Sequence, residues 1–188
     1  MSFSVLVIPE DQTYNGAILR PLVKRILTEC GKPKAKVDIP QVRLQGFDDA
    51  VRQMPGIVDR YSHMDLLLFI ADADGKDRLG RFTRLEREAA DRGGRLLCCA
   101  AQQEIEAWVL AGHVEQTGRT WQEIRADVSV KENVFEPFLA RRKDLRGRVF
   151  GGRDVLMEET LGSYEGLLQR CPELMELQEQ ICDAVASL

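Results

Sequence analysis

The sequence lacks the features that mark secreted, membrane and zinc-binding proteins. No apolar stretch approaches the roughly 20 residues that a membrane span needs, and the opening "MSFSVLVIPED" has neither a basic leader nor a small-residue cleavage site. Cysteines are odd in number, five, and include no C-x-x-C pair. This argues against a disulfide framework and against a zinc ribbon. We therefore expect a cytoplasmic protein with reduced thiols and no membrane segment.

Two common catalytic motifs are also missing. There is no G-x-x-x-x-G-K-[ST] loop for nucleotide phosphates and no G-x-S-x-G turn for a serine nucleophile. The formal net charge of -4 does not by itself indicate a nucleic-acid-binding protein. Basic residues nevertheless gather in 141–153, where six of them accompany the single acid Asp144. The candidate phosphate contacts in this segment are Arg141, Arg142, Arg146 and Arg153.

Short apolar runs alternate with amphipathic segments through the first part of the chain. Strands are expected in 3–9, 35–44, 66–71 and 95–101. The helix after the first strand is expected to begin near Pro21, and the next helical stretch to be interrupted at Pro55-Gly56. The run 66–71 does not alternate, which is typical of a central strand buried on both faces. The sequence therefore predicts an α/β fold, with a mostly parallel central sheet flanked by helices on both faces.

The pattern changes after about residue 112. Segments such as "ENVFEPFLARR" and "SYEGLLQRCPELMELQEQICDAVASL" favour helices and contain no convincing strand. We predict an α/β core over 1–112 and a helical C-terminal region over 113–188 that packs on the core as a cap. The amphipathic C-terminus could instead supply a surface for a partner, although core packing is the commoner use of such a helix.

Carboxylates follow three of the predicted strands. Glu10 comes directly after the first strand, Asp72 and Asp74 follow the run 66–71, and Glu106 lies just beyond the last strand. Functional groups in open α/β sheets gather at the carboxyl ends of strands. Side chains two residues apart on an extended chain point to the same side, so Asp72 and Asp74 are expected to face one point.

Carboxylate oxygens in such a group are hard ligands that suit Mg²⁺ or Mn²⁺. Without a cation they would repel one another. Any single acid is more simply read as a helix cap or a solvated strand end. For the set Glu10, Asp72, Asp74 and Glu106 we predict a metal site.

A glutamate after the first strand, followed by an apolar strand ending in D-x-D, resembles the Toprim domain of topoisomerases, primases, recombination proteins and nucleases of the overcoming-lysogenisation-defect type. The resemblance narrows to a family of small, stand-alone bacterial Toprim-like proteins, often encoded beside an ABC-type or SMC-like ATPase in settings suggestive of phage defence. It covers nearly the whole chain and is carried by "VIPEDQTYNGAILRPLVKRIL", "LLLFIADADGKDR", "EIEAWVLAGH", "VKENVFEPF" and "SYEGLLQRCPEL".

The resemblance implies a Toprim-like fold and roles for four acids. Glu10 matches the glutamate that serves as general acid/base or metal ligand, and Asp72 and Asp74 match the metal-binding pair. Glu106 matches the acid of the helix motif in the small family. The function expected first is a Mg²⁺-dependent nuclease with Glu10, Asp72 and Asp74 as catalytic residues.

Two other functions remain open at this point. The chain could be a non-catalytic effector or regulatory subunit of an ATPase partner, with a vestigial acidic site. A D-x-D glycosyltransferase is disfavoured, because 188 residues are few for a nucleotide-sugar domain plus an acceptor domain. The substrate and the oligomeric state, a homo-oligomer included, are not fixed by the sequence.

Overall fold

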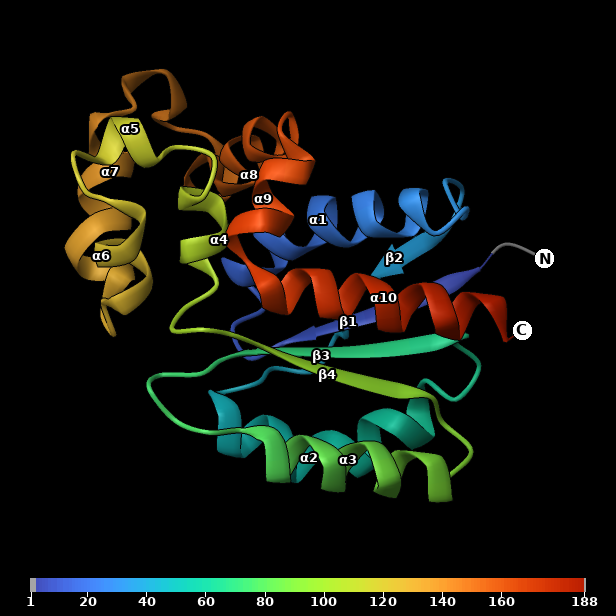
Figure 1. Cartoon of the computed structure of the whole chain (residues 1–188). Coiled ribbons are helices and arrows are strands. Elements are labelled where there is room, and N and C mark those ends of the chain that lie inside the picture. Colours follow the sequence, from blue (N-terminus) through green and yellow to red (C-terminus); the bar gives the residue numbers. More distant parts are fainter. Residues whose placement is uncertain (1–2, 188) are drawn as a thin grey trace.

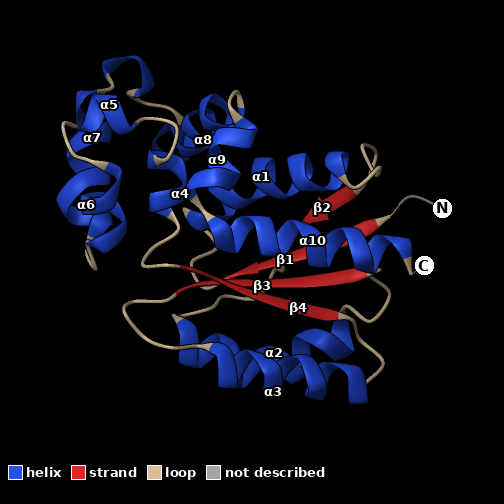
Figure 2. Ribbon diagram, in the orientation of Figure 1, coloured by secondary structure: helices blue, strands red, loops and turns tan. Residues whose placement is uncertain are grey.

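Four parallel strands form the sheet at the centre of the molecule, in the order β2-β1-β3-β4 (Figures 1 and 2). The structure is a computed structural model that describes residues 3–187. The strands are β1 (Ser4–Pro9), β2 (Lys36–Asp38), β3 (Leu66–Asp72) and β4 (Leu96–Ala101). In the register, Leu6 lies opposite Leu67, and Asp72 lies opposite Ala101. The predicted parallel sheet, with the run 66–71 as a central strand, is confirmed.

The lack of alternation in β3 follows from burial on both sides. Leu66, Leu68 and Ile70 belong to one apolar cluster, whereas Leu67 and Phe69 belong to another on the opposite face. Successive side chains of a strand point to opposite faces, so a strand covered on both sides must be apolar at every position.

Helices cover both faces, as the sequence predicts. Figure 2 shows helices below the sheet and long helices above it. The lower pair is α2 (Phe47–Arg60) and α3 (Leu79–Asp91), and the upper pair is α1 (Asn15–Glu29) and α10 (Pro172–Ala186). The upper layer therefore combines a helix from the start of the chain with one from its end.

Two predicted helix boundaries are wrong. Helix α1 begins at Asn15 instead of near Pro21, and α2 runs without interruption through Pro55. A proline inside a helix removes one backbone hydrogen bond and crowds the preceding turn. In α1 the turn before Pro21 is nevertheless helical, because it buries Ile18 and Leu19 completely. Tertiary packing thus offsets the local preference of proline.

Residues 113–187 contain helices and turns but no strand. Many of their apolar side chains share one core with β1, β3 and α1, so this region packs directly on the sheet. Helix α4 (Glu106–Leu110) lies just before this region. In addition to α10, the region contains α5 (Val114–Thr117), α6 (Trp121–Ala126), a π-helical turn (Lys131–Phe135), α7 (Glu136–Arg141), 3₁₀ turns (Lys143–Leu145 and Val149–Gly152), α8 (Arg153–Leu161) and α9 (Tyr164–Arg170). The boundary near residue 112 stays a prediction.

A disulfide joins Cys30, just after α1, to Cys182 in α10. The expectation of reduced thiols is wrong for this pair, because the two long helices lie side by side on the sheet and bring the residues together (Figure 1). The remaining cysteines, Cys98, Cys99 and Cys171, are free. Reduced thiols therefore no longer argue for the expected cytoplasmic location, which stays a prediction. None of the helices within residues 3–187 is long and apolar enough to cross a membrane.

Candidate functional site

The carboxyl ends of β1 and β3 meet at the point where the strand order reverses. From β1 the chain crosses through α1 to β2 on one side, and from β3 it crosses through α3 to β4 on the other. Open α/β sheets bind ligands in the crevice outside such a switch point. Glu10 follows β1 and Asp72 ends β3, so the fold delivers both acids to this crevice.

Backbone hydrogen bonds fix these two side chains. The Asp72 N–H donates to Glu10 Oε1 at 2.8 Å, and the Ile105 N–H donates to Asp72 Oδ1 at 2.7 Å. The Glu10 and Asp72 carboxyl groups are themselves close enough to share a hydrogen bond. The structure therefore brings together two of the predicted site residues and ties them to the segment that follows β4.

Glu106 begins α4 and is only 1% exposed. Its Oε1 is buried and has no hydrogen-bond partner. Lys131 and Arg153 favour its charged form electrostatically, yet within the described residues neither side chain bonds to it. A buried carboxylate oxygen without a donor is unfavourable by about 1–3 kcal/mol. Glu106 is therefore an acceptor that a proton or a cation would satisfy.

Burial raises the pKa of Glu10, of Asp72 and of Glu106, because a charged carboxylate loses hydration inside the protein. For Asp72 the charges of Glu10 and Glu106 add to the effect, and its pKa rises to about 8. Glu10 and Asp72 titrate as one pair because the state of each carboxyl group changes the pKa of the other. Near neutral pH the pair consequently holds a proton that separate carboxyls would have lost.

Asp74 differs from these acids. Strand β3 ends at Asp72, and Asp74 has a left-handed backbone with φ 51°, so the extended geometry expected for the D-x-D pair does not hold. The Asp74 side chain is 48% exposed and pairs with Arg78 at 3.3 Å. Its charge still raises the pKa of Glu10, which places Asp74 at the open side of the same crevice.

Arg78 is a site residue that the sequence analysis does not identify. Its guanidinium lies 3.8 Å from the centre of the Phe47 ring, and its Nε is buried without a partner. The positive charge of Arg78 also lowers the pKa of Glu10. No sequence signal distinguishes Arg78 from the other arginines of its segment, because its position depends on Phe47 in a different helix.

The four arginines predicted to contact nucleic acid occupy different environments. Arg141 donates to a main-chain carbonyl at 3.0 Å, and Arg142 pairs with Asp144 and Glu159. Arg153 is buried, and its Nη2 lies 2.9 Å from a carboxylate oxygen of α7. Arg146 is exposed and has no ion-pair partner among residues 3–187. Of the four, only Arg146 is therefore both exposed and without a bonded partner in its side chain.

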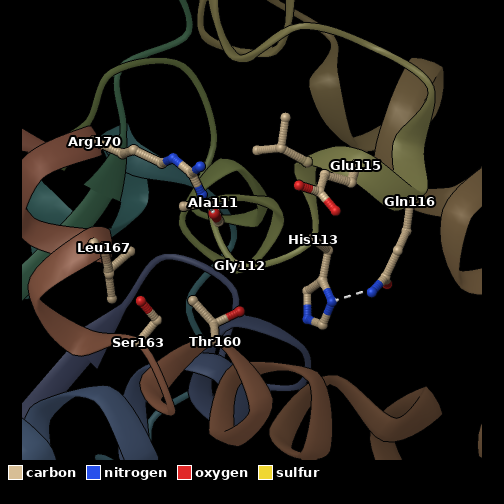
Figure 3. A pocket seen from close by; sticks show the side chains of 11 residues that line it. Ala111, Gly112, His113, Glu115, Gln116, Thr160, Ser163, Leu167 and Arg170 are labelled. Atoms are coloured by element: carbon tan, nitrogen blue, oxygen red, sulfur yellow. Dashed lines mark hydrogen bonds between the residues drawn. The ribbon is translucent and has the colours of Figure 1, made fainter.

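A separate cavity of about 270 Å³ lies between α5 and the α8–α9 region (Figure 3). Several of its polar groups are already bonded to the protein. His113 Nδ1 lies 3.2 Å from Gln116 Oε1, while Thr160 and Arg170 donate to main-chain carbonyls in and just after α4. These contacts hold α4 against α8 and α9. We assign the cavity a packing role and no chemistry.

The metal site predicted at Glu10, Asp72, Asp74 and Glu106 stays a prediction. Within residues 3–187, no group of three or more His, Cys, Asp or Glu side chains has an arrangement that would hold a metal ion. Mg²⁺, however, usually takes only one or two carboxylates and keeps several waters. Glu10 and Asp72 supply hard oxygens at one point, and Glu106 adds an unpartnered one.

No family model, curated protein or solved structure matches this chain. The resemblance to the Toprim domain therefore stays a prediction from the sequence motifs.

Proposed function

We propose that the protein is a Mg²⁺- or Mn²⁺-dependent enzyme of Toprim type that cleaves phosphodiester bonds in nucleic acid. One observation carries the proposal, namely the group of buried carboxylates at the switch point of the sheet. Glu10, Asp72 and Glu106 have raised pKa values there, and one oxygen of Glu106 has no donor. Such a group is unfavourable unless protons or a cation neutralise it.

A divalent cation held by the Glu10 and Asp72 carboxylates, with water as its other ligands, would polarise a phosphate and lower the pKa of a bound water. The chain itself supplies the remaining groups. In the metal-free protein the Glu10–Asp72 pair retains a proton near neutral pH, so a cation that binds there would displace this proton. Arg78, held by the Phe47 ring, presents a positive charge beside the carboxylates that can pair with a phosphate oxygen.

Thermal unfolding with and without metal tests the proposal. Millimolar Mg²⁺ or Mn²⁺ should raise the melting temperature of the wild type, because a ligand that binds only the folded state stabilises it, by about 2.7 kcal/mol at 100 times its Kd. Asp72→Asn should abolish this shift. The matched control is Asp91→Asn, which makes the same change at an exposed end of α3 and should leave the shift intact.

Cleavage assays complete the test. Labelled single-stranded DNA, double-stranded DNA and RNA are incubated with each variant in Mg²⁺ or in EDTA. Metal-dependent cleavage by the wild type and by Asp91→Asn, but not by Asp72→Asn, is the expected result. A wild type that neither gains stability from either metal nor cleaves any of the three substrates contradicts the proposal and favours the non-catalytic subunit with a vestigial site.

A further inference from the structure

A cavity of about 420 Å³ opens between α1 and α8, which pack against each other (Figure 1). We call it the α1–α8 cavity. Its volume falls within the roughly 300–1,000 Å³ typical of small-molecule sites. Its wall begins at Gln12, two residues after Glu10, so the cavity adjoins the loop that carries the acidic site. The residues that line it include Gln12, Arg20, Lys24, Phe150, Asp154 and Glu158.

One wall of the α1–α8 cavity is positively charged. Arg20 and Lys24 stand one helical turn apart on α1 and are both exposed. Within residues 3–187 neither side chain has an ion-pair or hydrogen-bond partner. This distinguishes them from Arg142 and Arg153, whose guanidinium groups are bonded to carboxylates. Two unpaired cations at this spacing suit a phosphate group.

An aromatic side chain stands at the mouth of the cavity. Phe150 is 44% exposed, and its backbone is left-handed with φ 56°. Gly151 and Gly152 are left-handed as well, but glycine adopts this conformation without the steric penalty that a phenylalanine meets. The chain therefore holds a bulky ring toward solvent in an unfavourable conformation. An exposed ring of this kind can stack on a nucleobase.

The wall opposite the cations carries an unsatisfied acceptor. Asp154, at the start of α8, has a buried Oδ1 without a hydrogen-bond donor, and Glu158 lies one turn further along the same helix. A ligand that enters here should bring donors to this wall and an anion to the wall formed by Arg20 and Lys24. A sugar hydroxyl or an exocyclic amine supplies such a donor.

We propose that the α1–α8 cavity binds one nucleotide unit, with its phosphate at Arg20 and Lys24, its base against Phe150 and a sugar or base donor at Asp154. The assignment of this nucleotide unit to the substrate of the enzyme rests on the proposed function. Binding itself needs neither metal nor turnover. The nucleotide could come from a nucleic-acid strand next to the cleaved bond or from a free nucleotide, because both present the same three groups.

Binding is measured in EDTA by calorimetry, with adenosine 5′-monophosphate, adenosine, ribose 5-phosphate and a short single-stranded oligodeoxyadenylate as probes. Arg20→Gln should weaken binding of the phosphate-bearing probes about tenfold. Phe150→Leu should weaken binding of the base-bearing probes at least about fivefold. The matched control Arg87→Gln removes the same charge from an exposed position on α3 and should bind like the wild type.

If only the oligonucleotide binds, the proposal is supported and the nucleotide comes from a nucleic-acid strand. If the monophosphate binds, the proposal is supported and the ligand is a free nucleotide. No binding of any probe up to about 1 mM overturns it, as does binding that Arg20→Gln and Phe150→Leu leave unchanged. Asp72→Asn should bind every probe normally. Nucleotide binding in the α1–α8 cavity is therefore tested independently of the nuclease proposal. Absence of cleavage would not contradict nucleotide binding, and absence of nucleotide binding would not contradict metal-dependent cleavage.

Discussion

Two groups of charged residues in this chain have opposite relations to their surroundings. At the switch point of the sheet, Glu10, Asp72 and Glu106 are packed together and buried or partly buried, with more negative charge than nearby cations neutralise. Near the surface, Arg142 bonds to both Asp144 and Glu159, so each charge has a partner. The first group is unfavourable in the isolated chain, and the second is satisfied. Such contrasts separate candidate functional sites from structural ion pairs.

The two groups also differ in the sign of their pKa shifts. Burial and mutual repulsion raise the pKa values of the first group, whereas the bonds to Arg142 lower the pKa values of Asp144 and Glu159. A raised carboxyl pKa disfavours the folded state at high pH, and a lowered one favours it there. Each group can therefore be changed separately and its effect read from activity or from stability.

The largest expected effect comes from neutralising the first group. Glu10→Gln keeps an oxygen that can accept from the Asp72 N–H but removes one charge and one proton site. If the acids hold the metal, cleavage should fall about a thousandfold, equivalent to about 4 kcal/mol of transition-state stabilisation. Initial rates under saturating substrate measure the change. Unchanged cleavage would show that Glu10 has no catalytic part.

The second prediction concerns pH in the absence of metal. Because the folded pKa of Asp72 is raised, the stability linked to this group is full below about pH 4 and should be lost, by up to a few kcal/mol, as pH rises toward about 8. Chemical denaturation in EDTA between pH 5 and pH 8 measures this loss. Asp72→Asn should flatten the profile. A profile equally steep in the variant would mean that other groups cause it.

A third prediction addresses the satisfied group. Arg142→Gln removes the partner of Asp144 and Glu159, and the free energy of unfolding at pH 7 should fall only slightly, because partly exposed ion pairs contribute little. Below about pH 4 the difference from the wild type should shrink as the carboxylates become protonated. Denaturation curves at both pH values test this. Any loss of the metal-induced shift would contradict the separation of the two groups.

The smallest predicted effect has the opposite sign. Phe150→Gly keeps the left-handed backbone but removes the steric penalty that the phenylalanine side chain meets there, and should stabilise the protein by up to about 1 kcal/mol. The same change should weaken nucleotide binding in the α1–α8 cavity. Thermal unfolding and calorimetry on one preparation measure both. A variant that is less stable than the wild type would indicate that the Phe150 ring packs to advantage in the free protein.

The architecture follows from local patterns, but several details do not. The run 66–71 identifies a doubly covered strand because burial on both faces demands apolar residues at each position. The positions of Glu10, Asp72 and Glu106 follow in turn, since parallel strands bring their carboxyl ends to one edge. Helix boundaries were less predictable. Pro21 and Pro55 lie inside helices, because burial of their neighbours outweighs the lost hydrogen bonds.

Features that join distant segments were not predictable from one sequence. Arg78 depends on stacking against Phe47, and Cys30 pairs with Cys182 across a sequence separation of 152 residues. Neither contact leaves a local pattern. The conformation of Asp74 was not predictable either, although Asp74 is only two residues from Asp72. The extended geometry assumed for D-x-D ends at Asp72.

The Cys30–Cys182 bond has a mechanical consequence. If the two ends of the oxidised chain were pulled apart, force would act only on the stretches outside the bond, which extend to about 130 Å against about 680 Å for the whole reduced chain. The outer stretch at the start of the chain contains β1 and α1. Pulling should therefore remove the strand that carries Glu10 while the segment from β2 to the last turns of α10 stays enclosed in a covalent loop.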